Sequence, residues 1–147
     1  MIEGCEATYV CEVGTLQKGL DLAMVFTMSD AKNVLGHPLE PCSVQPMTGW
    51  FRDGSCRTDA SDRGAHVVCA RVNAAFLSYS KAQGNDLTTP RSGFPGLKDG
   101  DCWCLCAARF AEAEAAGFAP GVSLRSTEES ALRIVPLEKL VRYSVDE

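Results

Sequence analysis

The segment Asp101-Cys102-Trp103-Cys104-Leu105-Cys106-Ala107 alternates cysteines with large apolar residues. Alternation with a period of two is typical of a β-strand, in which successive side chains point to opposite faces. We therefore predict a strand over 102–107 whose three thiols share one face of a sheet, with Trp103 and Leu105 on the other face. The chain has eight cysteines in 147 residues, so this strand is where we expect sulfur chemistry to centre.

Signals on either side of this strand predict further regular elements. Residues 66–72 are rich in valine and have the length of a buried strand. Asn73 follows them as a good helix N-cap, so we predict a helix over 74–83. An alanine-rich helix over 108–116 follows the cysteine strand, and Gly117 is placed to end it.

The C-terminal part predicts a third strand and two more helices. We expect a short strand over 121–125. Ser126-Thr127-Glu128-Glu129 has the form of a capping box, which predicts a helix over 127–134, and Pro136 fits the first turn of a last helix. The repeated order of strand and helix favours an α/β or α+β fold, a single small domain with a mixed sheet flanked by helices and with long irregular loops.

Length and composition are those of one ordinary globular domain. The chain is 46% hydrophobic and 22% charged, and 147 residues are enough to bury a core without covalent staples. The formal net charge is −5, and no basic stripe is present to neutralise a phosphate backbone. We therefore do not expect a nucleic-acid partner.

The start of the chain differs from the rest. We predict that residues 1–32 are an N-terminal extension and that residues 33–147 form the single globular domain. The longest apolar run in the extension, Leu22 to Met28, is too short to cross a bilayer. Three glutamates precede this run, whereas an export signal has basic residues there. We therefore expect no membrane attachment, a cytoplasmic location and reduced cysteines.

Two long segments, 42–64 and 85–100, are rich in glycine, proline and short polar residues, which is typical of irregular structure. Such segments in small domains are often functional. If both lie over one edge of the sheet, their polar groups can bind a small polar or anionic molecule, with or without catalysis. The candidate ligand-binding residues are Asp53, Asn85, Asp86, Thr88 and Arg91. The same side chains also suit turns that bind no ligand, because they bond neighbouring backbone groups.

Cysteine and histidine side chains suggest a second kind of site. The set that could bind zinc or carry out thiol redox chemistry is Cys42, Cys56, His66, Cys69, Cys104 and Cys106. No two cysteines are separated by two residues, so a zinc ribbon and a thioredoxin motif are excluded. Plain packing also explains Cys104 and Cys106, because cysteine is a small residue that is often buried. A third alternative is an interaction module without chemistry.

Several uncommon motifs occur in a fixed order, and together they resemble the bacterial domain of unknown function 2237 over roughly residues 33–142. The resemblance implies a small soluble domain with no established activity. It also implies that Cys104 and Cys106 belong to the family pattern, whereas the position of Cys102 is usually occupied by a basic or other residue. The motifs are Asn33-Val-Leu-Gly-His-Pro-Leu-Glu-Pro-Cys42, Pro46-Met-Thr-Gly-Trp-Phe-Arg-Asp-Gly54, His66-Val-Val-Cys69, Gly84-Asn-Asp-Leu-Thr-Thr-Pro-Arg91, Gly93-Phe-Pro-Gly-Leu97 and Trp103-Cys-Leu-Cys-Ala107.

Overall fold

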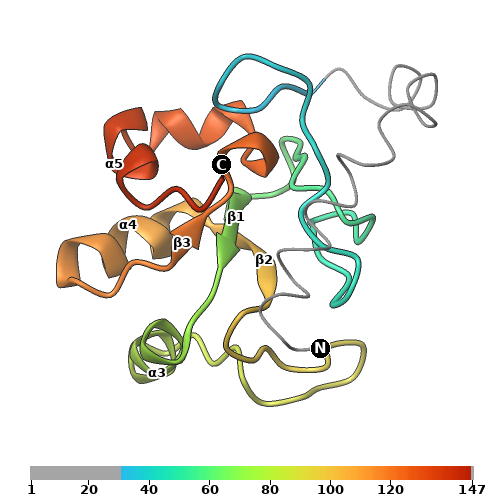
Figure 1. The fold of residues 1–147 in the computed structure, drawn as a ribbon. Coiled ribbons are helices and arrows are strands. Elements are labelled where there is room, and N and C mark those ends of the chain that lie inside the picture. Colours follow the sequence, from blue (N-terminus) through green and yellow to red (C-terminus); the bar gives the residue numbers. More distant parts are fainter. Residues whose placement is uncertain (1–30, 147) are drawn as a thin grey trace.

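The computed structural model describes residues 31–146 and is built on a three-stranded sheet (Figure 1). Its strands are β1 (His66–Arg71), β2 (Cys102–Cys106) and β3 (Gly121–Val122), in the order β2-β1-β3. Both strand pairs are antiparallel, so the α+β alternative is confirmed and the expected mixed sheet is not formed. This order makes β2 an edge strand, with one side open to the loops.

Local capping signals fix the two helices that follow β1 and β2. The side chain of Asn73 accepts a hydrogen bond from the backbone N–H of Phe76, and helix α3 (Ala74–Ala82) begins there, as predicted. Helix α4 (Ala107–Ala116) ends at Gly117, whose φ of 87° lies in the left-handed region that glycine adopts without strain. Both predicted helices are confirmed to within one residue at each end.

Two of the three C-terminal elements differ from the prediction, whereas the last helix is confirmed. Strand β3 stops at Val122, and the 3-10 helix η1 (Leu124–Ser126) replaces the end of the expected strand. The expected helix over 127–134 is the short 3-10 helix η2 (Glu129–Arg133). Helix α5 (Leu137–Arg142) then follows Pro136, which lies at its N-cap.

Thr127 explains why no helix begins at the predicted capping box. Its hydroxyl donates to the carbonyl of Ser123 and accepts from the backbone N–H of Cys69, at 2.7 and 3.1 Å. These tertiary bonds hold Thr127 in an extended conformation. Glu128 takes over as N-cap and accepts from the N–H of Ser130. A long-range contact to β1 therefore overrides a local helix signal.

The two faces of the sheet have different cores. Helices α4 and α5 lie on one side of β1, and the irregular residues 40–64 (cyan to green) lie on the other (Figure 1). Trp103 and Leu105 belong to the main apolar core, together with Phe76 and Phe110 of the helices. A second buried cluster consists of five cysteines, Cys42, Cys56, Cys69, Cys102 and Cys104. The predicted separation of sulfur and apolar side chains on β2 is confirmed for residues 102–105.

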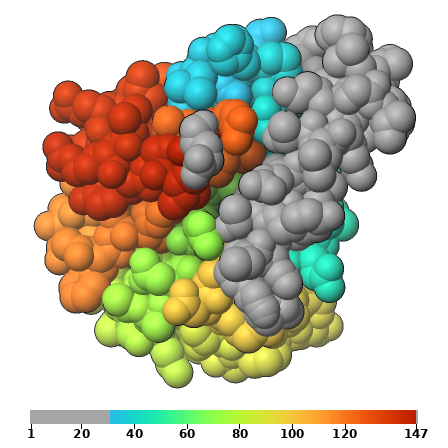
Figure 2. All heavy atoms as spheres, viewed as in Figure 1, coloured from blue at the N-terminus to red at the C-terminus, as the bar shows by residue number. Residues whose placement is uncertain are grey.

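The residues after position 31 join the C-terminal half of the domain. Buried Asn33 donates from its side-chain amide to the carbonyl of Arg125 at 3.0 Å, and the N–H of Val34 donates to Thr127 at 3.0 Å. Figure 2 shows this segment (blue) packed against the orange and red residues of the C-terminal half. Most of the predicted extension over residues 1–32 lies outside the described residues. No helix in the described part of the chain is long and apolar enough to span a membrane.

Candidate functional site

The two irregular segments meet at the β2 edge of the sheet, where they enclose a cleft of about 630 Å³. This volume is within the usual range for small-molecule sites. Because β2 is an edge strand, the cleft reaches side chains from both of its faces. The lining consists of Gly49, Trp50 and Arg52 from the first segment, Asn85, Leu87, Arg91 and Phe94 from the second, and His66, Trp103, Cys104, Leu105, Cys106 and Arg109 from β1, β2 and α4.

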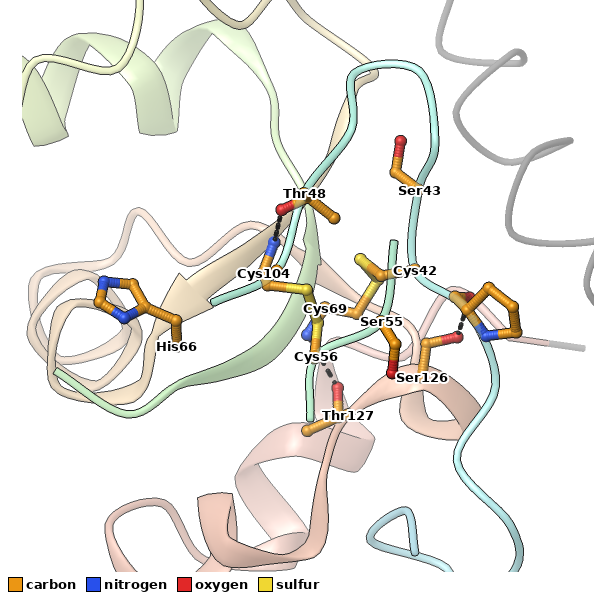
Figure 3. Close-up of a disulfide and its surroundings, with 12 residues drawn as sticks. Cys42, Ser43, Thr48, Ser55, Cys56, His66, Cys69, Cys104, Ser126 and Thr127 are labelled. Carbon is orange, nitrogen blue, oxygen red and sulfur yellow. Dashed lines mark hydrogen bonds between the residues drawn. A yellow bond between two sulfur atoms is a disulfide. The ribbon is translucent and has the colours of Figure 1, made fainter. Parts of the chain in front are cut away.

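Two disulfide bonds attach the first segment to the sheet. Cys42 is bonded to Cys69 on β1, and Cys56 is bonded to Cys104 on β2. All four residues are buried, and the sulfur atoms of Cys42, Cys56 and Cys104 lie within 4.8 Å of one another (Figure 3). The expectation of reduced cysteines is therefore wrong for these four. It failed because the fold brings distant cysteines into contact, which their spacing in the sequence does not reveal.

Two threonine hydroxyls bond to the sheet beside the disulfides, Thr48 from the first segment and Thr127 from the C-terminal half. Thr48 accepts a hydrogen bond from the backbone N–H of Cys104 at 2.8 Å, and Thr127 does the same for Cys69. Figure 3 shows both bonds next to the sulfur atoms. The two backbone N–H groups are buried and would otherwise lack a partner at these places in the sheet. The first segment therefore replaces part of a missing neighbouring strand on β2.

His66 is held in one orientation at the wall of the cleft. Its Nδ1 lies 2.7 Å from Oδ1 of Asp62, whose side chain is completely buried. The Trp50 ring stacks on the imidazole, with centroids 5.8 Å apart and planes 9° apart. Burial alone would raise the pKa of Asp62, but hydrogen bonds from the side chain and backbone of His66 and from Thr58 outweigh it and hold that pKa below its usual value.

Three arginines give the cleft a positive charge. Arg52 donates to the carbonyl of Gly49 at 2.7 Å, and its guanidinium lies 5.2 Å from the centroid of the Trp103 ring. Arg91 donates to the carbonyl of Asp86 at 2.7 Å and lies 5.1 Å from the Phe94 ring. Within residues 31–146, neither of these two guanidinium groups forms a salt bridge. Arg109 is paired with Glu112 at 3.2 Å.

Arg52 was not among the predicted ligand-binding residues. Its φ of 55° lies in the left-handed region, which costs a residue other than glycine about 1–2 kcal/mol. The hydrogen bond from its backbone N–H to Gly49, at 3.0 Å, closes the tight turn that holds this conformation. The turn-forming composition of residues 46–54 is visible in the sequence, but the direction in which the turn points Arg52 is not.

The predicted polar residues divide into two groups. Asn85 and Arg91 line the cleft. Asp53 pairs with Arg57 at 2.7 Å instead. The carboxylate of Asp86 accepts bonds from the amide and hydroxyl groups of Thr88 and of the next residue, Thr89. The Thr89 hydroxyl, followed by the Thr88 amide, holds the pKa of Asp86 well below its usual value.

The predicted set of cysteines and histidine also divides. The sulfur atoms of Cys42, Cys56, Cys69 and Cys104 gather in the buried cluster, whereas His66 lies apart from them (Figure 3). His66 instead lies directly opposite Cys106 in the β1–β2 pair, and both line the cleft. Cys106 is half-buried and outside both disulfides. A zinc site that joins His66 to the cluster is therefore not formed.

Comparison with protein families gives one match. A family model described as an uncharacterized protein conserved in bacteria (DUF2237) covers residues 32–144. The chain belongs to this family. No curated protein matches the chain. Membership in DUF2237 confirms the resemblance seen in the sequence motifs.

Proposed function

We propose that this DUF2237 domain binds a small anionic molecule that has an apolar or planar part. The observation that carries the proposal is the convergence of Arg52, Arg91 and Arg109 on a cleft with no carboxylate among its described lining residues. Arg109 is paired with Glu112, but Arg52 and Arg91 form no salt bridge within residues 31–146, and such uncompensated cations in a cleft favour a negatively charged ligand.

The surroundings of the arginines support this proposal. Arg52 and Arg91 are hydrogen-bonded to backbone carbonyls, which orient their charges, and no carboxylate of residues 31–146 forms a salt bridge with either. Each guanidinium lies over an aromatic ring of the cleft, at Trp103 and Phe94. Such stacking fixes the guanidinium plane and leaves N–H groups that can donate to a carboxylate or phosphate in pairs.

Aromatic and aliphatic side chains in the walls of the cleft suit the apolar or planar part of the ligand. Trp103 and Phe94 contact each other edge to face, with centroids 5.2 Å apart, and Leu87 lines the same cleft. Trp50 closes the side next to His66. Apolar walls with a few converging polar groups are the usual composition of small-molecule sites. Asn85 adds an amide that can donate or accept a hydrogen bond.

A thermal-shift and calorimetry screen tests the proposal. The panel pairs aryl and alkyl carboxylates and phosphates with their neutral amides or esters. We expect at least one anion to raise the melting temperature while its neutral counterpart does not, because a ligand that binds only the folded state stabilises it. The Arg52→Ala and Arg91→Ala double variant should lose the shift, and Arg133→Ala, which removes an arginine outside the cleft, should keep it. A panel without any shift, or a shift that survives in the double variant, would overturn the proposal.

A second candidate function is favoured by the four clustered sulfur atoms. We propose that the reduced protein binds one zinc ion through Cys42, Cys56, Cys69 and Cys104. Three of these sulfurs lie within 4.8 Å of one another and the fourth is bonded to one of them. In a tetrahedral four-thiolate site with zinc–sulfur bonds of about 2.3 Å, the sulfurs are about 3.8 Å apart. A dithiol reductant supplies two electrons and two protons to each disulfide, and zinc then displaces the thiol protons.

Metal analysis after reduction tests the second candidate. Protein reduced by a dithiol, supplied with zinc and desalted should retain about one equivalent. Cys42→Ser should lose most of this zinc, and Cys106→Ser, which removes a thiol outside the cluster, should retain it. Retention below about a tenth of an equivalent would remove this candidate. The first proposal does not depend on this result.

A further inference from the structure

We infer that Cys106 is a thiol nucleophile that attacks an electrophilic carbon of the bound anion, with His66 as the base that takes its proton. The inference rests on the proposed binding of an anion in the cleft and assigns that anion a chemical class. The ligand would carry a negative group for the arginines and a reactive carbon for the sulfur.

His66 and Cys106 are directly opposite each other in the antiparallel β1–β2 pair. The register shifts between His66 and Val68, and such a β-bulge re-aims side chains at this end of the strand pair. Both residues line the cleft. Hydrogen bonds between a base and a nucleophile are often longer without substrate and shorten when it binds.

Cys106 is more accessible than the four cysteines of the disulfides. Cys106 is half-buried and outside both disulfides, whereas Cys42, Cys56, Cys69 and Cys104 are buried and bonded in pairs. Cys106 is also the N-cap of α4, and its side chain makes no capping hydrogen bond there. The thiol therefore lies at the N-terminus of α4 and is not used in capping it.

Contacts with neighbouring residues fix the orientation of the His66 ring. Nδ1 of His66 is occupied by buried Asp62, so Nε2 is the nitrogen left to accept a proton. Trp50 covers one face of the ring. Gly64 packs so closely on its edge that a Cβ there would come within 2.7 Å of Cε1. A nucleophile and a base whose second nitrogen is held by a carboxylate form the arrangement used for covalent catalysis.

The proposed step balances as a displacement. The Cys106 thiol gives its proton to Nε2 of His66. The sulfur electron pair forms a carbon–sulfur bond, and the bond from that carbon to its leaving group breaks. The leaving group departs with the bonding electrons, so the products are a thioether or thioester on Cys106, a protonated His66 and the free leaving group. No oxidant or reductant takes part.

Alkylation by a matched pair of reagents tests the inference in the full chain with its disulfides intact. Iodoacetate and iodoacetamide have the same reactive carbon, but only iodoacetate is an anion. Mass spectrometry of peptides gives the alkylation rate at Cys106. We expect the ratio of the iodoacetate rate to the iodoacetamide rate to be about tenfold higher at Cys106 than for free cysteine, because the arginines attract the anion. His66→Asn should lower both rates by about tenfold to a hundredfold.

The variants separate failure of the two proposals. Arg52→Ala with Arg91→Ala should return the ratio of the iodoacetate rate to the iodoacetamide rate to that of free cysteine. A normal ratio in the unaltered chain, together with a large effect of His66→Asn, would refute anion binding but keep the nucleophile. A raised ratio that is accompanied by no effect of His66→Asn would refute the role of His66 and keep anion binding.

A folding control keeps the role of Cys106 falsifiable. If His66→Asn does not fold, His66→Gln is compared by the same rates after circular dichroism has shown a native spectrum. Cys106→Ser should remove the rapidly labelled site altogether. If the Cys106 peptide of the folded, unaltered chain reacts with neither reagent faster than it does after unfolding, the inference is wrong.

Discussion

The two rims of the cleft are held in place by different kinds of interaction. The first rim, residues 42–56, is joined to β1 and β2 by two disulfides that link positions 27 and 48 residues apart in the chain. The second rim, residues 85–97, is organised mainly by bonds within itself, such as those to the Asp86 carboxylate. Its two ends are joined by the N–H of Leu97, which donates to the carbonyl of Leu87 at 2.8 Å.

Because of this difference, the two rims should respond differently when the interactions that hold them are removed. A covalent link across a long loop stabilises the fold mainly by restricting the unfolded chain, so its loss is felt by the whole domain. Hydrogen bonds within one short segment organise that segment, and their loss opens it locally. Loss of the links that hold the first rim should therefore lower global stability, whereas loss of hydrogen bonds within the second rim should chiefly weaken ligand binding through Arg91.

The largest effect is expected from removal of the disulfides. Cys42→Ser and Cys56→Ser each break one link, and each should lower the free energy of unfolding by about 3–4 kcal/mol according to the loop-closure model. Urea unfolding, with and without a reductant, measures the effect. Cys106→Ser is the matched control and should change the free energy of unfolding by less than about 0.5 kcal/mol. Equal unfolding midpoints for oxidised and reduced protein would contradict the covalent attachment of the first rim.

A pair of glycines compares the rims directly. Gly49 in the first rim and Gly96 in the second have φ values of 104° and 84°. A Cβ on Gly49 would lie 2.3 Å from the carbonyl oxygen of Ser55, and one on Gly96 would lie 2.4 Å from that of Thr88. The free energy of unfolding should fall by more than about 2 kcal/mol in both alanine variants, because the clash adds to the cost of the left-handed conformation. Gly96→Ala should also abolish anion binding, since no covalent bond holds its rim.

Two other glycines serve as controls for this comparison. Gly36 and Gly93 also have positive φ values, but nothing lies within 4 Å of an added Cβ. In their alanine variants the free energy of unfolding should fall by only about 1–2 kcal/mol, which is the cost of the backbone conformation alone. If Gly49→Ala and Gly96→Ala were no worse than these controls in urea unfolding, the close backbone approach would not be important for either rim.

The hydrogen-bonded part of the first rim is tested by Thr48→Val. This change keeps the shape of the side chain but removes the acceptor for the buried N–H of Cys104. We expect the free energy of unfolding to fall by about 1–3 kcal/mol, which is less than for removal of a disulfide, because the disulfides still attach the rim. Thr127→Val should lower the free energy of unfolding more than Thr48→Val does. It removes both the acceptor for the backbone N–H of Cys69 and the donor to the carbonyl of Ser123. Calorimetry measures both, and a larger loss for Thr48→Val would contradict this order.

The sequence predicts what depends on near neighbours. The alternation over residues 102–106 identifies the strand and its two faces, and Asn73 and Gly117 mark helix ends through bonds to residues a few positions away. The last helix after Pro136 is confirmed as well, but the predicted strand over 121–125 is too long and the predicted helix over 127–134 is wrong. There, Thr127 bonds to Cys69, a residue 58 positions away that no local pattern includes.

The same distinction applies to the candidate site. The two rims, with Asn85 and Arg91, are visible as irregular segments with polar side chains. The pairing of the cysteines is not visible, because four cysteines allow three pairings and only the folded sheet selects one. Asp62 is one of several acidic residues in the first segment, and its hydrogen bond to His66 follows from the turn that precedes β1.

The smallest effect is expected from acid, which acts on the second rim through Asp86. Hydrogen bonds from Thr89 and Thr88 hold the pKa of Asp86 below its ordinary value of 3.8. A lowered pKa means that the carboxylate stabilises the closed rim fully above the ordinary value, and that this stabilisation is lost as the pH falls through the lowered value. The pKa of Asp62 is also lowered, but the disulfides that hold the first rim do not titrate.

Hydrogen exchange followed from about pH 6 to about pH 2 measures the difference between the rims. Protection of the Thr88 and Thr89 amides should decrease at the acid end, after correction for the intrinsic exchange rate, while the amide of Cys42, which donates to Gly54, stays protected. Asp86→Asn is the control, because its uncharged side chain should make protection of the second rim weaker and independent of pH. Equal loss of protection in both rims would show that acid opens the whole domain and that the two rims are not independent.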